Sequence, residues 1–211
     1  MALRLIAEHL VKNAGAIGWS EVGTGEAVLI QRCAAGEQSA CAELVSSHER
    51  MVFQLALHLM GDRDEALDLS QEVFLRVFRT LHTFRGQSAL RTWIYRIAIN
   101  QARNRQRWWR RRRRSDQVQL EHHVQDHGEL RQPGDGDAPD RAFARQEMAT
   151  RLWAALDELP FDQRTVIVLR ELDGMSYDEI AESLNVAVGT VKSRLTRARQ
   201  TLRRELQEVR P

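Results

Sequence analysis

With 211 residues, the chain has room for one large or two small domains, and 43% of its residues are apolar. No apolar run comes near the ~20 residues that a membrane-spanning helix needs, so we do not expect an integral membrane protein. The formal net charge of +2 averages two opposite blocks, since Arg103–Arg114 holds eight arginines whereas Ser115–Asp140 holds seven carboxylates and one arginine. Adjacent blocks of opposite sign indicate separate electrostatic roles.

Residues 1–25 end in a glycine-rich stretch, and we expect a short helical or frayed extension without an assigned function. Its ALRLIAEHLV is too short and too interrupted by charge for a secretory signal, which predicts a cytoplasmic protein. The only two cysteines, Cys33 and Cys41, lack CxxC spacing and partnered histidines, so neither a disulfide framework nor a zinc site is indicated. We interpret both as buried small apolar side chains, with redox sensing as the alternative.

Residues 26–114 are predicted to form a helical bundle, because they contain no alternating strand pattern and no proline. A first helix should end at Gly61, a natural helix terminator, and a second should begin at about Asp64. The three expected buried stripes are Leu44, His48, Val52, Leu55 and Leu59; then Leu69, Val73, Phe74, Val77 and Leu81; then Leu90, Trp93, Ile94 and Ile97. Three such stripes joined by short loops predict a compact bundle.

The helical pattern fails in residues 115–140, where prolines, glycines and aspartates cluster, and this segment is predicted to be a flexible acidic linker. His123 and His127 have ligand-like spacing there, but we do not assign them a metal. A second helical domain follows, in which Phe161–Leu172 is expected to form a helix closed by Gly174. Before it, a stripe that ends at Pro160 predicts another helix, with Ala144, Met148, Leu152, Ala155, Leu156 and Leu159 on its buried side.

The stretch from Ser176 to Leu202 is predicted to be two short helices joined by a tight turn. Ser176 and Glu179 form a capping box, and Asn185 tolerates the left-handed backbone that turns the chain. The second helix should bury one stripe, formed by Val191, Leu195, Ala198 and Leu202. Its opposite side carries hydroxyl, amide and basic groups, which is the chemistry of a recognition helix in the DNA major groove. A solvated basic face on an ordinary helical hairpin is the alternative.

A second basic surface is predicted on the third helix of the first domain. Its members fall within about 60° of one another on a helical wheel, and they are Arg96, Asn100, Arg103 and Arg107. We call this set the ridge. Its arginines are suited to binding consecutive DNA phosphates. A solvated helix face is the alternative. The preceding polar loop, Phe84–Arg91, has a glycine and an aromatic residue that suit the capture of an unstacked base.

The arginine block beyond this ridge has two interpretations. Arg110–Arg114 extends the ridge and is favoured as a clamp on the DNA backbone, with a solubilising helix tail as the alternative. Trp108 and Trp109 beside it are equally suited to stacking on nucleotides and to packing against the bundle.

The helix that begins near Asp64 presents a different flank, on which an apolar residue lies among acidic and amide groups. Its members at helical spacing are Leu67, Asp68, Gln71 and Glu72, and we call them the acidic flank. Because carboxylates would repel DNA, a protein partner explains this surface better. Solvated acidic residues favoured by the dipole at a helix N-terminus are the alternative.

Three motifs follow one another along the chain: GDRDEALDLSQEVFLRVFRTL, TFRGQSALRTWIYRIAINQARNRQR and LDELPFDQRTVIVLRELDGMSYDEIAESLNVAVGTVKSRLTRAR. Together they resemble the successive conserved regions of an extracytoplasmic function (ECF) sigma factor, the group 4 family, from about Glu26 to Leu206. The chain is therefore predicted to be all-α, with an extension (1–25), an N-terminal helical bundle (26–114), an acidic linker (115–140) and a C-terminal four-helix helix-turn-helix domain (141–211).

The resemblance implies three sets of contact residues. Core RNA polymerase would be gripped, at the beta-prime clamp helices, by Leu67, Asp68, Gln71 and Glu72. The minus-ten promoter element would be bound by Phe84, Arg85, Gly86, Gln87, Ser88 and Arg91 of the loop and by Arg96, Asn100, Arg103 and Arg107 of the ridge. The minus-thirty-five element would be approached by Arg170, Thr190, Lys192, Ser193, Arg194, Thr196 and Arg197.

The expected function is that of a non-enzymatic subunit that binds core polymerase, including its beta subunit, recognises both elements of promoter DNA and helps to melt the downstream one. The resemblance also implies a cognate anti-sigma factor, often one that holds its partner at the inner face of the membrane. No cofactor, metal or small-molecule substrate is expected, since the sequence has no phosphate-binding glycine loop, nucleophile–base motif or metal-ligand cluster. A helix-turn-helix regulator that does not engage polymerase is the alternative, and the acidic flank argues against it.

Overall fold

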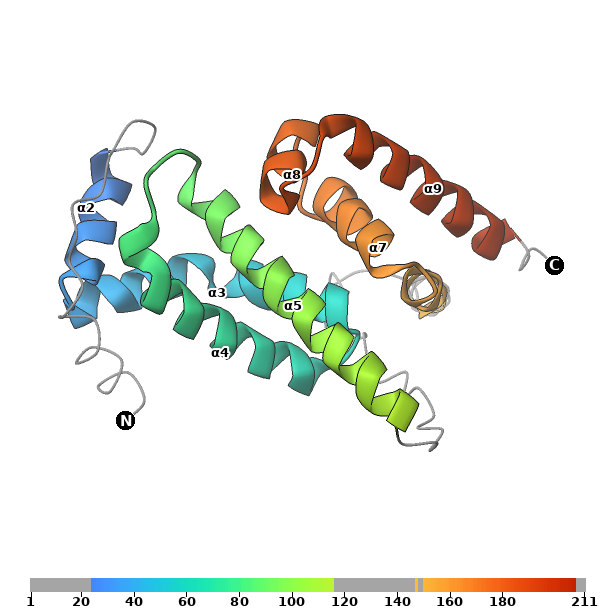
Figure 1. Ribbon diagram of the computed structural model, residues 1–211, viewed down its shortest axis with the longest axis horizontal. Helices are drawn as coiled ribbons and strands as arrows, with labels where there is room; N and C mark the ends of the chain where they lie inside the picture. The colour runs from blue at the N-terminus through green and yellow to red at the C-terminus, as the bar shows by residue number, and fades with distance from the viewer. Residues whose placement is uncertain (1–23, 116–146, 148–149, 208–211) are drawn as a thin grey trace, which may run out of the picture. The chain divides into compact units, whose positions relative to one another are not determined.

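The computed structural model describes residues 24–115, 147 and 150–207, and all secondary structure within them is helical (Figure 1). The all-α prediction is confirmed for these residues. Most of the predicted N-terminal extension and nearly all of the predicted acidic linker lie outside them, as do His123, His127, Ala144 and Met148. No helix in the described part of the chain is long and apolar enough to cross a membrane.

The chain divides into two compact units. The first holds the described residues up to Leu57 together with Asp64–Trp108, and the second holds His58–Arg63 together with the described residues from Trp109 onward.

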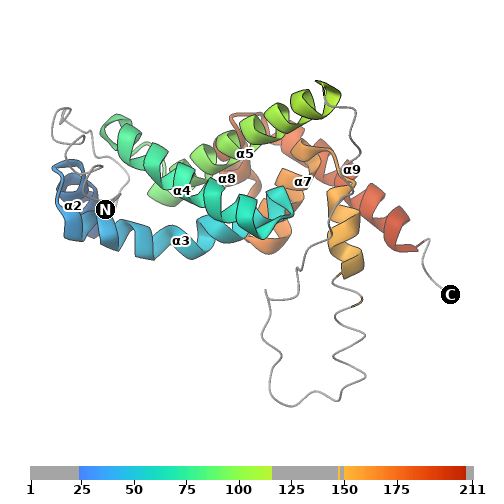
Figure 2. The same ribbon diagram turned by 90° about the horizontal axis from the view of Figure 1, so that it is seen from below.

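Four α-helices and a 3₁₀ turn contribute most or all of their residues to the first unit. They are α2 (Thr24–Ala34), α3 (Gln38–Met60), α4 (Arg63–Thr80), the turn η1 (Leu81–Thr83) and α5 (Leu90–Ser115). Figures 1 and 2 both show α3, α4 and α5 side by side, with α2 at one end of α3. Gly61, with a φ of 73°, follows α3 directly, so the predicted end of this helix is confirmed.

The predicted buried side of α4 is confirmed in full, because Leu69, Val73, Phe74 and Val77 are all buried, and so is Leu81 in η1. On α3, Leu44, Val52, Leu55 and Leu59 are buried, whereas His48 is only partly buried and its Nδ1 lies 3.0 Å from the carbonyl oxygen of Leu44.

The predicted stripe of α5 was too narrow. Leu90 and Ile94 are buried as expected, but Trp93 and Ile97 are only partly buried. The core instead takes in a second row, formed by Tyr95, Ala98, Ile99 and Ala102. The phenol of Tyr95 can be enclosed because its oxygen accepts a hydrogen bond from Arg91 Nη2 at 3.2 Å, which offsets the cost of removing it from water.

The second unit contains a helix at residues 150–157, then α7 (Phe161–Ile167), the π-helical turn η3 (Val168–Leu172), α8 (Tyr177–Leu184) and α9 (Val188–Gln207). The helix expected over Phe161–Leu172 is thus present, but its last turn widens to a π-helix. Gly174, with a φ of 70°, follows this turn as predicted. Helices α7 and α8 both pack against α9.

The capping box and the turn between α8 and α9 are confirmed. Ser176 Oγ accepts from the backbone nitrogen of Glu179 at 3.2 Å, and the carboxylate of Glu179 accepts from the backbone nitrogen of Ser176 at 2.7 Å. Asn185 ends α8 in the left-handed conformation, with a φ of 53°. Val191, Leu195 and Ala198 are buried along α9, whereas Leu202 is partly buried.

Candidate functional site

The ridge on α5 lies on one unbroken helix, because α5 is continuous from Leu90 to Ser115. Asn100 and Arg107 are exposed, and Arg96 and Arg103 are partly buried. At a rise of about 1.5 Å per residue, the four side chains cover a length of roughly 16 Å along the helix. Such a face can follow several consecutive phosphates, and the amide of Asn100 can exchange hydrogen bonds with a base edge.

The loop before α5 has an inner and an outer set of side chains. Phe84 is only 2% exposed, and its ring centroid lies 5.3 Å from that of Trp93. Ser88 is also buried, and Gly86 adopts a φ of 66°, which a residue with a side chain rarely adopts. We had expected the aromatic ring to be available to a base; instead it packs into the core and anchors the loop.

Three longer polar side chains form the outer set, since Arg85, Gln87 and Arg91 are exposed. Arg91 is steadied by Tyr95, whose hydroxyl accepts its hydrogen bond and whose ring centroid lies 5.5 Å from its guanidinium carbon. The loop therefore offers hydrogen-bond donors on a fixed backbone rather than an aromatic platform.

The acidic flank of α4 is exposed along its whole length. Leu67, Asp68, Gln71 and Glu72 all lie on the surface, and Leu67 is 43% exposed, which makes it one of few large apolar side chains exposed among the described residues. An apolar side chain surrounded by carboxylate and amide groups suits a protein partner with basic and apolar groups of its own.

A residue that sequence reasoning had passed over connects this flank to α5. Arg105 Nη2 donates to Glu72 Oε1 at 3.0 Å, while Nη1 lies 2.9 Å from Glu65 Oε2 and donates to the Glu65 carbonyl oxygen at 2.9 Å. One guanidinium thus neutralises a carboxylate of the acidic flank and fixes the first turn of α4. Arg105 had been counted only as part of the arginine block.

In the second unit, the outer face of α9 carries the side chains predicted for the minus-thirty-five element. Lys192, Ser193, Thr196 and Arg197 are exposed, and Thr190 is partly buried. The hydroxyls of Ser193 and Thr196 donate to backbone oxygens one turn earlier, at 2.9 and 3.0 Å, and each hydroxyl oxygen can still accept a hydrogen bond.

Arg170 and Lys192 meet at the ring of Tyr177. The guanidinium carbon of Arg170 lies 4.9 Å from the ring centroid and Lys192 Nζ lies 6.0 Å from it, both within cation–π range. Arg170 Nη1 also donates to the Met175 carbonyl oxygen at 2.7 Å, which holds the turn before α8. Arg170 therefore has a structural role whatever else it binds.

Two further arginines of α9 are held by carboxylates of the preceding helices. Arg194, which was predicted to approach DNA, is partly buried and donates to Asp162 Oδ2 of α7 at 2.9 Å. Arg199 donates to Glu171 Oε1 at 2.6 Å, and this hydrogen bond raises the pKa of the guanidinium. Of the basic side chains on this helix, Lys192 and Arg197 are thus better placed than Arg194 to approach a ligand.

Among the described residues, no group of three or more histidine, cysteine, aspartate or glutamate side chains could hold a metal ion. The polar groups gather instead in the exposed patches on α4, α5, the loop before α5 and α9. Their chemistry is that of macromolecular recognition.

Comparison with known proteins decides the family. Residues 44–115 match the family model described as Sigma-70 region 2, and residues 149–202 match the one described as Sigma-70, region 4. The RNA polymerase sigma-H factor of Pseudomonas aeruginosa is 37% identical over 181 residues, which cover 86% of this chain and 93% of that relative. The chain belongs to the ECF sigma factors. The ECF RNA polymerase sigma-E factor of Escherichia coli K12 is likewise 36% identical over 185 residues, covering 86% and 94% of the two chains.

Solved structures agree with this assignment. The structure of CnrH in complex with the cytosolic domain of CnrY has a TM-score of 0.62 and 27% identity, covering 87% of this ECF sigma factor and 97% of that chain. The sigma factor RpoE in complex with the anti-sigma factor NepR from Bartonella quintana has a TM-score of 0.62 and 26% identity, covering 80% and 98%. The acidic flank, the loop and the ridge fall within region 2, and the basic face of α9 falls within region 4. This ECF sigma factor thus acts in transcription initiation, in a family of non-catalytic factors.

Proposed function

We propose that this ECF sigma factor binds core RNA polymerase through the acidic flank of α4, binds the minus-ten element through the loop and the ridge, and binds the minus-thirty-five element through α9. This proposal rests on one observation: the exposed carboxylates of the acidic flank lie on α4, whereas exposed basic residues predicted to bind DNA lie on α5 and α9. DNA repels carboxylates and attracts arginines, so surfaces of opposite charge suit different partners. In this proposal residues 26–114 act as the polymerase-binding and melting domain, and residues 141–211 as the upstream DNA-binding domain.

Binding of core polymerase centres on Leu67 and Asp68. Leu67 would bury its exposed side chain against the beta-prime clamp helices, and Asp68 would pair with a basic residue there. Gln71 and Glu72 extend the same face by one turn, and Arg105 keeps the Glu72 carboxylate in position.

Melting at the minus-ten element requires a base to leave the duplex, which costs a few kcal/mol of unstacking. The outer side chains of the loop and the amide of Asn100 would offset this cost by hydrogen bonds to the extruded base. The arginines of the ridge would meanwhile hold the adjacent phosphates.

Recognition of the minus-thirty-five element would use the exposed face of α9 in the major groove. Arg197 and Lys192 can donate to guanine, and the hydroxyl oxygens of Ser193 and Thr196 can accept from exocyclic amino groups. Arg170 and Arg194 would support this face through Tyr177 and α7, with any phosphate contact as an added role.

An anti-sigma factor is the further proposed partner. RpoE of Bartonella quintana, which this chain resembles over most of its length, is bound to the anti-sigma factor NepR in its structure. A cognate anti-sigma factor anchored in the membrane would hold this protein at the inner face and release it on a signal.

Reconstitution with core RNA polymerase tests the proposal. Wild-type protein should form a stable complex with core enzyme and direct transcription from promoters selected out of genomic DNA by that holoenzyme. Asp68→Arg should reduce the association by reversing the charge of the acidic flank, whereas Arg79→Ala, an exposed change elsewhere on α4, should not. The proposal fails if wild-type protein does not associate with core enzyme, or if Asp68→Arg leaves both association and transcription unchanged.

A further inference from the structure

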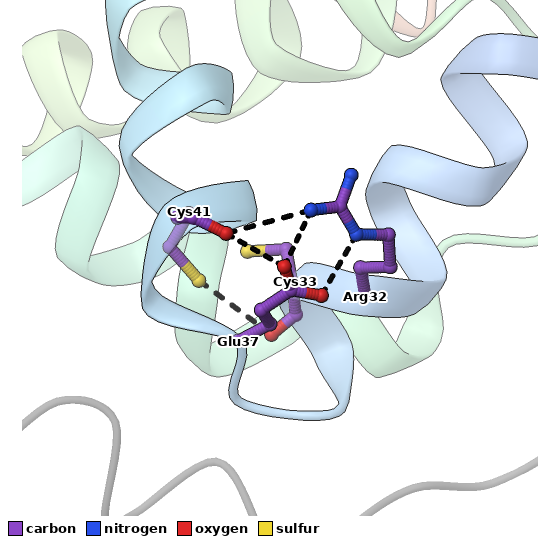
Figure 3. Close-up of polar contacts among 5 residues, drawn as sticks. Arg32, Cys33, Glu37 and Cys41 are labelled. Atoms are coloured by element: carbon purple, nitrogen blue, oxygen red, sulfur yellow. Dashed lines mark hydrogen bonds and ion pairs between the residues drawn. The ribbon is translucent and has the colours of Figure 1, made fainter.

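The two cysteines of the chain meet at the corner between α2 and α3. Cys33 belongs to the last turn of α2 and Cys41 to the first turn of α3, and the sequence contains no other cysteine. Cys33 is fully buried and Cys41 is 7% exposed, which confirms the expectation that both are buried. Figure 3 shows both sulfur atoms between the end of α2 and the start of α3. This corner lies outside the residues that match the region 2 family model.

The backbone of this corner is closely defined. Gly36 has a φ of 87° and donates to the Cys33 carbonyl oxygen at 3.0 Å, while Glu37 donates from its backbone nitrogen to the Arg32 carbonyl oxygen at 3.0 Å. This pair of bonds is a Schellman motif, in which a left-handed glycine ends a helix and reverses the chain. The reversal brings a residue on the first turn of α3 back beside the last turn of α2.

An exposed cluster of polar contacts lies at the same corner between α2 and α3. Arg32 Nε donates to Glu37 Oε2 at 2.7 Å and its Nη2 binds Glu37 Oε1, while Ser39 Oγ donates to Glu37 Oε1 at 2.6 Å (Figure 3). The side chain before Cys33 is therefore tied to a residue of the connecting turn.

The Cys41 thiol contacts the backbone of Cys33. Cys41 Sγ donates to the Cys33 carbonyl oxygen at 3.6 Å. A hydrogen bond between the two side chains, together with burial, raises the pKa of Cys33, and the same bond lowers the pKa of Cys41 against the opposing effects of burial and of Glu37. A position in the first turn of a helix also favours a thiolate. These directions favour Cys41 over Cys33 as the thiol that loses its proton.

We propose that Cys33 and Cys41 form a thiol–disulfide site, which a peroxide oxidises to an intramolecular disulfide between α2 and α3. In the first step, the Cys41 thiolate attacks one oxygen of hydrogen peroxide, so that a sulfur–oxygen bond forms and the oxygen–oxygen bond breaks. The released hydroxide takes up the proton that Cys41 had lost and becomes water. Cys41 is now a sulfenic acid.

In the second step, the Cys33 sulfur attacks the Cys41 sulfur, and the sulfur–sulfur bond replaces the sulfur–oxygen bond. The hydroxide that leaves takes the Cys33 proton and becomes a second water. Two thiols and one peroxide thus give one disulfide and two waters, with both sulfurs oxidised and both peroxide oxygens reduced. A thiol or thioredoxin-type dithiol would reverse the reaction by exchange.

The disulfide has a structural consequence beyond the corner. Helix α2 packs against the turn η1, and η1 ends at Thr83, directly before the loop Phe84–Arg91. A covalent bond from α2 to α3 would restrict the separation of α2 from the bundle. The oxidised protein should therefore show slower amide hydrogen exchange in α2 and η1 than the reduced protein.

Oxidation of the reduced, full-length protein with hydrogen peroxide under native conditions tests this site. The main product should be lighter than the reduced protein by the mass of two hydrogen atoms, should yield a Cys33–Cys41 linked peptide on mass-spectrometric mapping, and should revert with dithiothreitol. In Cys33→Ser, Cys41 should instead accumulate as a sulfenic acid that dimedone traps. In Cys41→Ser, no intramolecular disulfide should form, and dimedone should trap less sulfenic acid on Cys33 than it traps on Cys41 in Cys33→Ser, because burial disfavours the Cys33 thiolate.

Circular dichroism of each variant confirms that the helices persist, and Cys33→Ala replaces Cys33→Ser if serine is not tolerated at this buried position. The proposal is overturned if native wild-type protein gives only sulfenic or sulfinic acid, if the disulfide joins two molecules, or if the linkage forms only in denaturant. Equal hydrogen exchange of α2 in the oxidised and reduced forms would overturn the structural consequence.

Discussion

The guanidinium of Arg105 on α5 binds the carboxylate of Glu72 on α4, with Nη2 3.0 Å from Oε1. The same guanidinium binds Glu65 in the first turn of α4, at 2.9 Å, and its side chain is only 18% exposed. Helix α5 carries the ridge proposed to follow DNA, and α4 carries the flank proposed to bind polymerase. Arg105 therefore joins the two surfaces, so a change at either helix can displace a residue of the other.

Replacing Arg105 by alanine should destabilise the packing of α4 on α5 by about 1 kcal/mol, because three charge-assisted contacts are lost but two of the acceptors remain partly hydrated. Native-state hydrogen exchange of amides in α4 and α5 would measure this change. Arg107→Ala, an exposed change on the same helix, should stay within ~0.5 kcal/mol. A double-mutant cycle with Glu72→Ala should give a nonzero coupling energy; strictly additive effects would contradict the contact.

The capping box at α8 predicts a second stability effect. Ser176→Ala removes the acceptor for the Glu179 backbone nitrogen and should destabilise α8 by about 1 kcal/mol. Ser193→Ala is the matched control, because its hydroxyl donates to a helix oxygen that already has a backbone partner one turn away. Hydrogen exchange of the α8 amides should increase in Ser176→Ala alone. An equal increase in both variants would mean that the cap contributes nothing specific.

Local patterns in the sequence predicted the features that depend on neighbours one helical turn away. The buried side of α4 has a clear helical period, and Ser176, Glu179 and Asn185 have backbone preferences that act within a few residues, so these were foreseen. The core of α5 was underestimated at Tyr95, which is buried with its hydroxyl bonded to Arg91. Because a tyrosine side chain ends in a hydroxyl group, the apolar pattern of the sequence does not predict that it is buried.

Contacts between distant residues could not be predicted in this way. Phe84 lies in a polar loop that also contains a glycine, so the sequence pattern does not predict its burial. Its ring is enclosed because it packs against Trp93, which belongs to the following helix. The pairing of Arg105 with Glu72 depends on how α4 crosses α5, and that of Arg194 with Asp162 on how α7 packs against α9. Helical periodicity gives the direction of each side chain from its own axis, but not the partner that it meets.

Arg197→Ala tests direct recognition by α9. The exposed guanidinium should bind a base edge of the minus-thirty-five element, so its loss should weaken binding of that DNA by the reconstituted holoenzyme by ~1–3 kcal/mol. Arg199→Ala is the control on the same helix, and it should cost less because Arg199 is held by Glu171. Fluorescence anisotropy with matched and scrambled upstream elements would separate the roles. An equal loss on both DNAs would show that Arg197 contacts only phosphates.

Asn100→Ala tests the melting role of α5. The exposed amide is proposed to bond an extruded base, so the variant should retain its affinity for core polymerase but form fewer open complexes. Permanganate footprinting of the minus-ten region would report the unpaired thymines, and gel shift with core enzyme would report the association. Asn104→Ala, an exposed change one turn along α5, is the control and should behave like the wild type. Normal permanganate reactivity in Asn100→Ala would remove Asn100 from the melting mechanism.

The turn between α2 and α3 should respond to acid. The hydrogen bonds that Glu37 accepts from Arg32 and Ser39 lower its pKa to about 2, below the value of about 4.3 expected in the unfolded chain. A carboxyl group with a depressed folded-state pKa contributes stability above its unfolded pKa and loses it as the pH falls toward its folded pKa. The stabilisation from Glu37 should therefore be complete at neutral pH and decline between about pH 4.5 and the folded pKa of about 2.

Thermal unfolding of wild type and Glu37→Gln across this interval should show a difference in Tm that narrows as the pH falls, and the carboxyl carbon resonance of Glu37 should titrate at its lowered pKa. A midpoint near the ordinary glutamate value, or a Tm difference independent of pH, would show that the ion pair with Arg32 is not formed in solution.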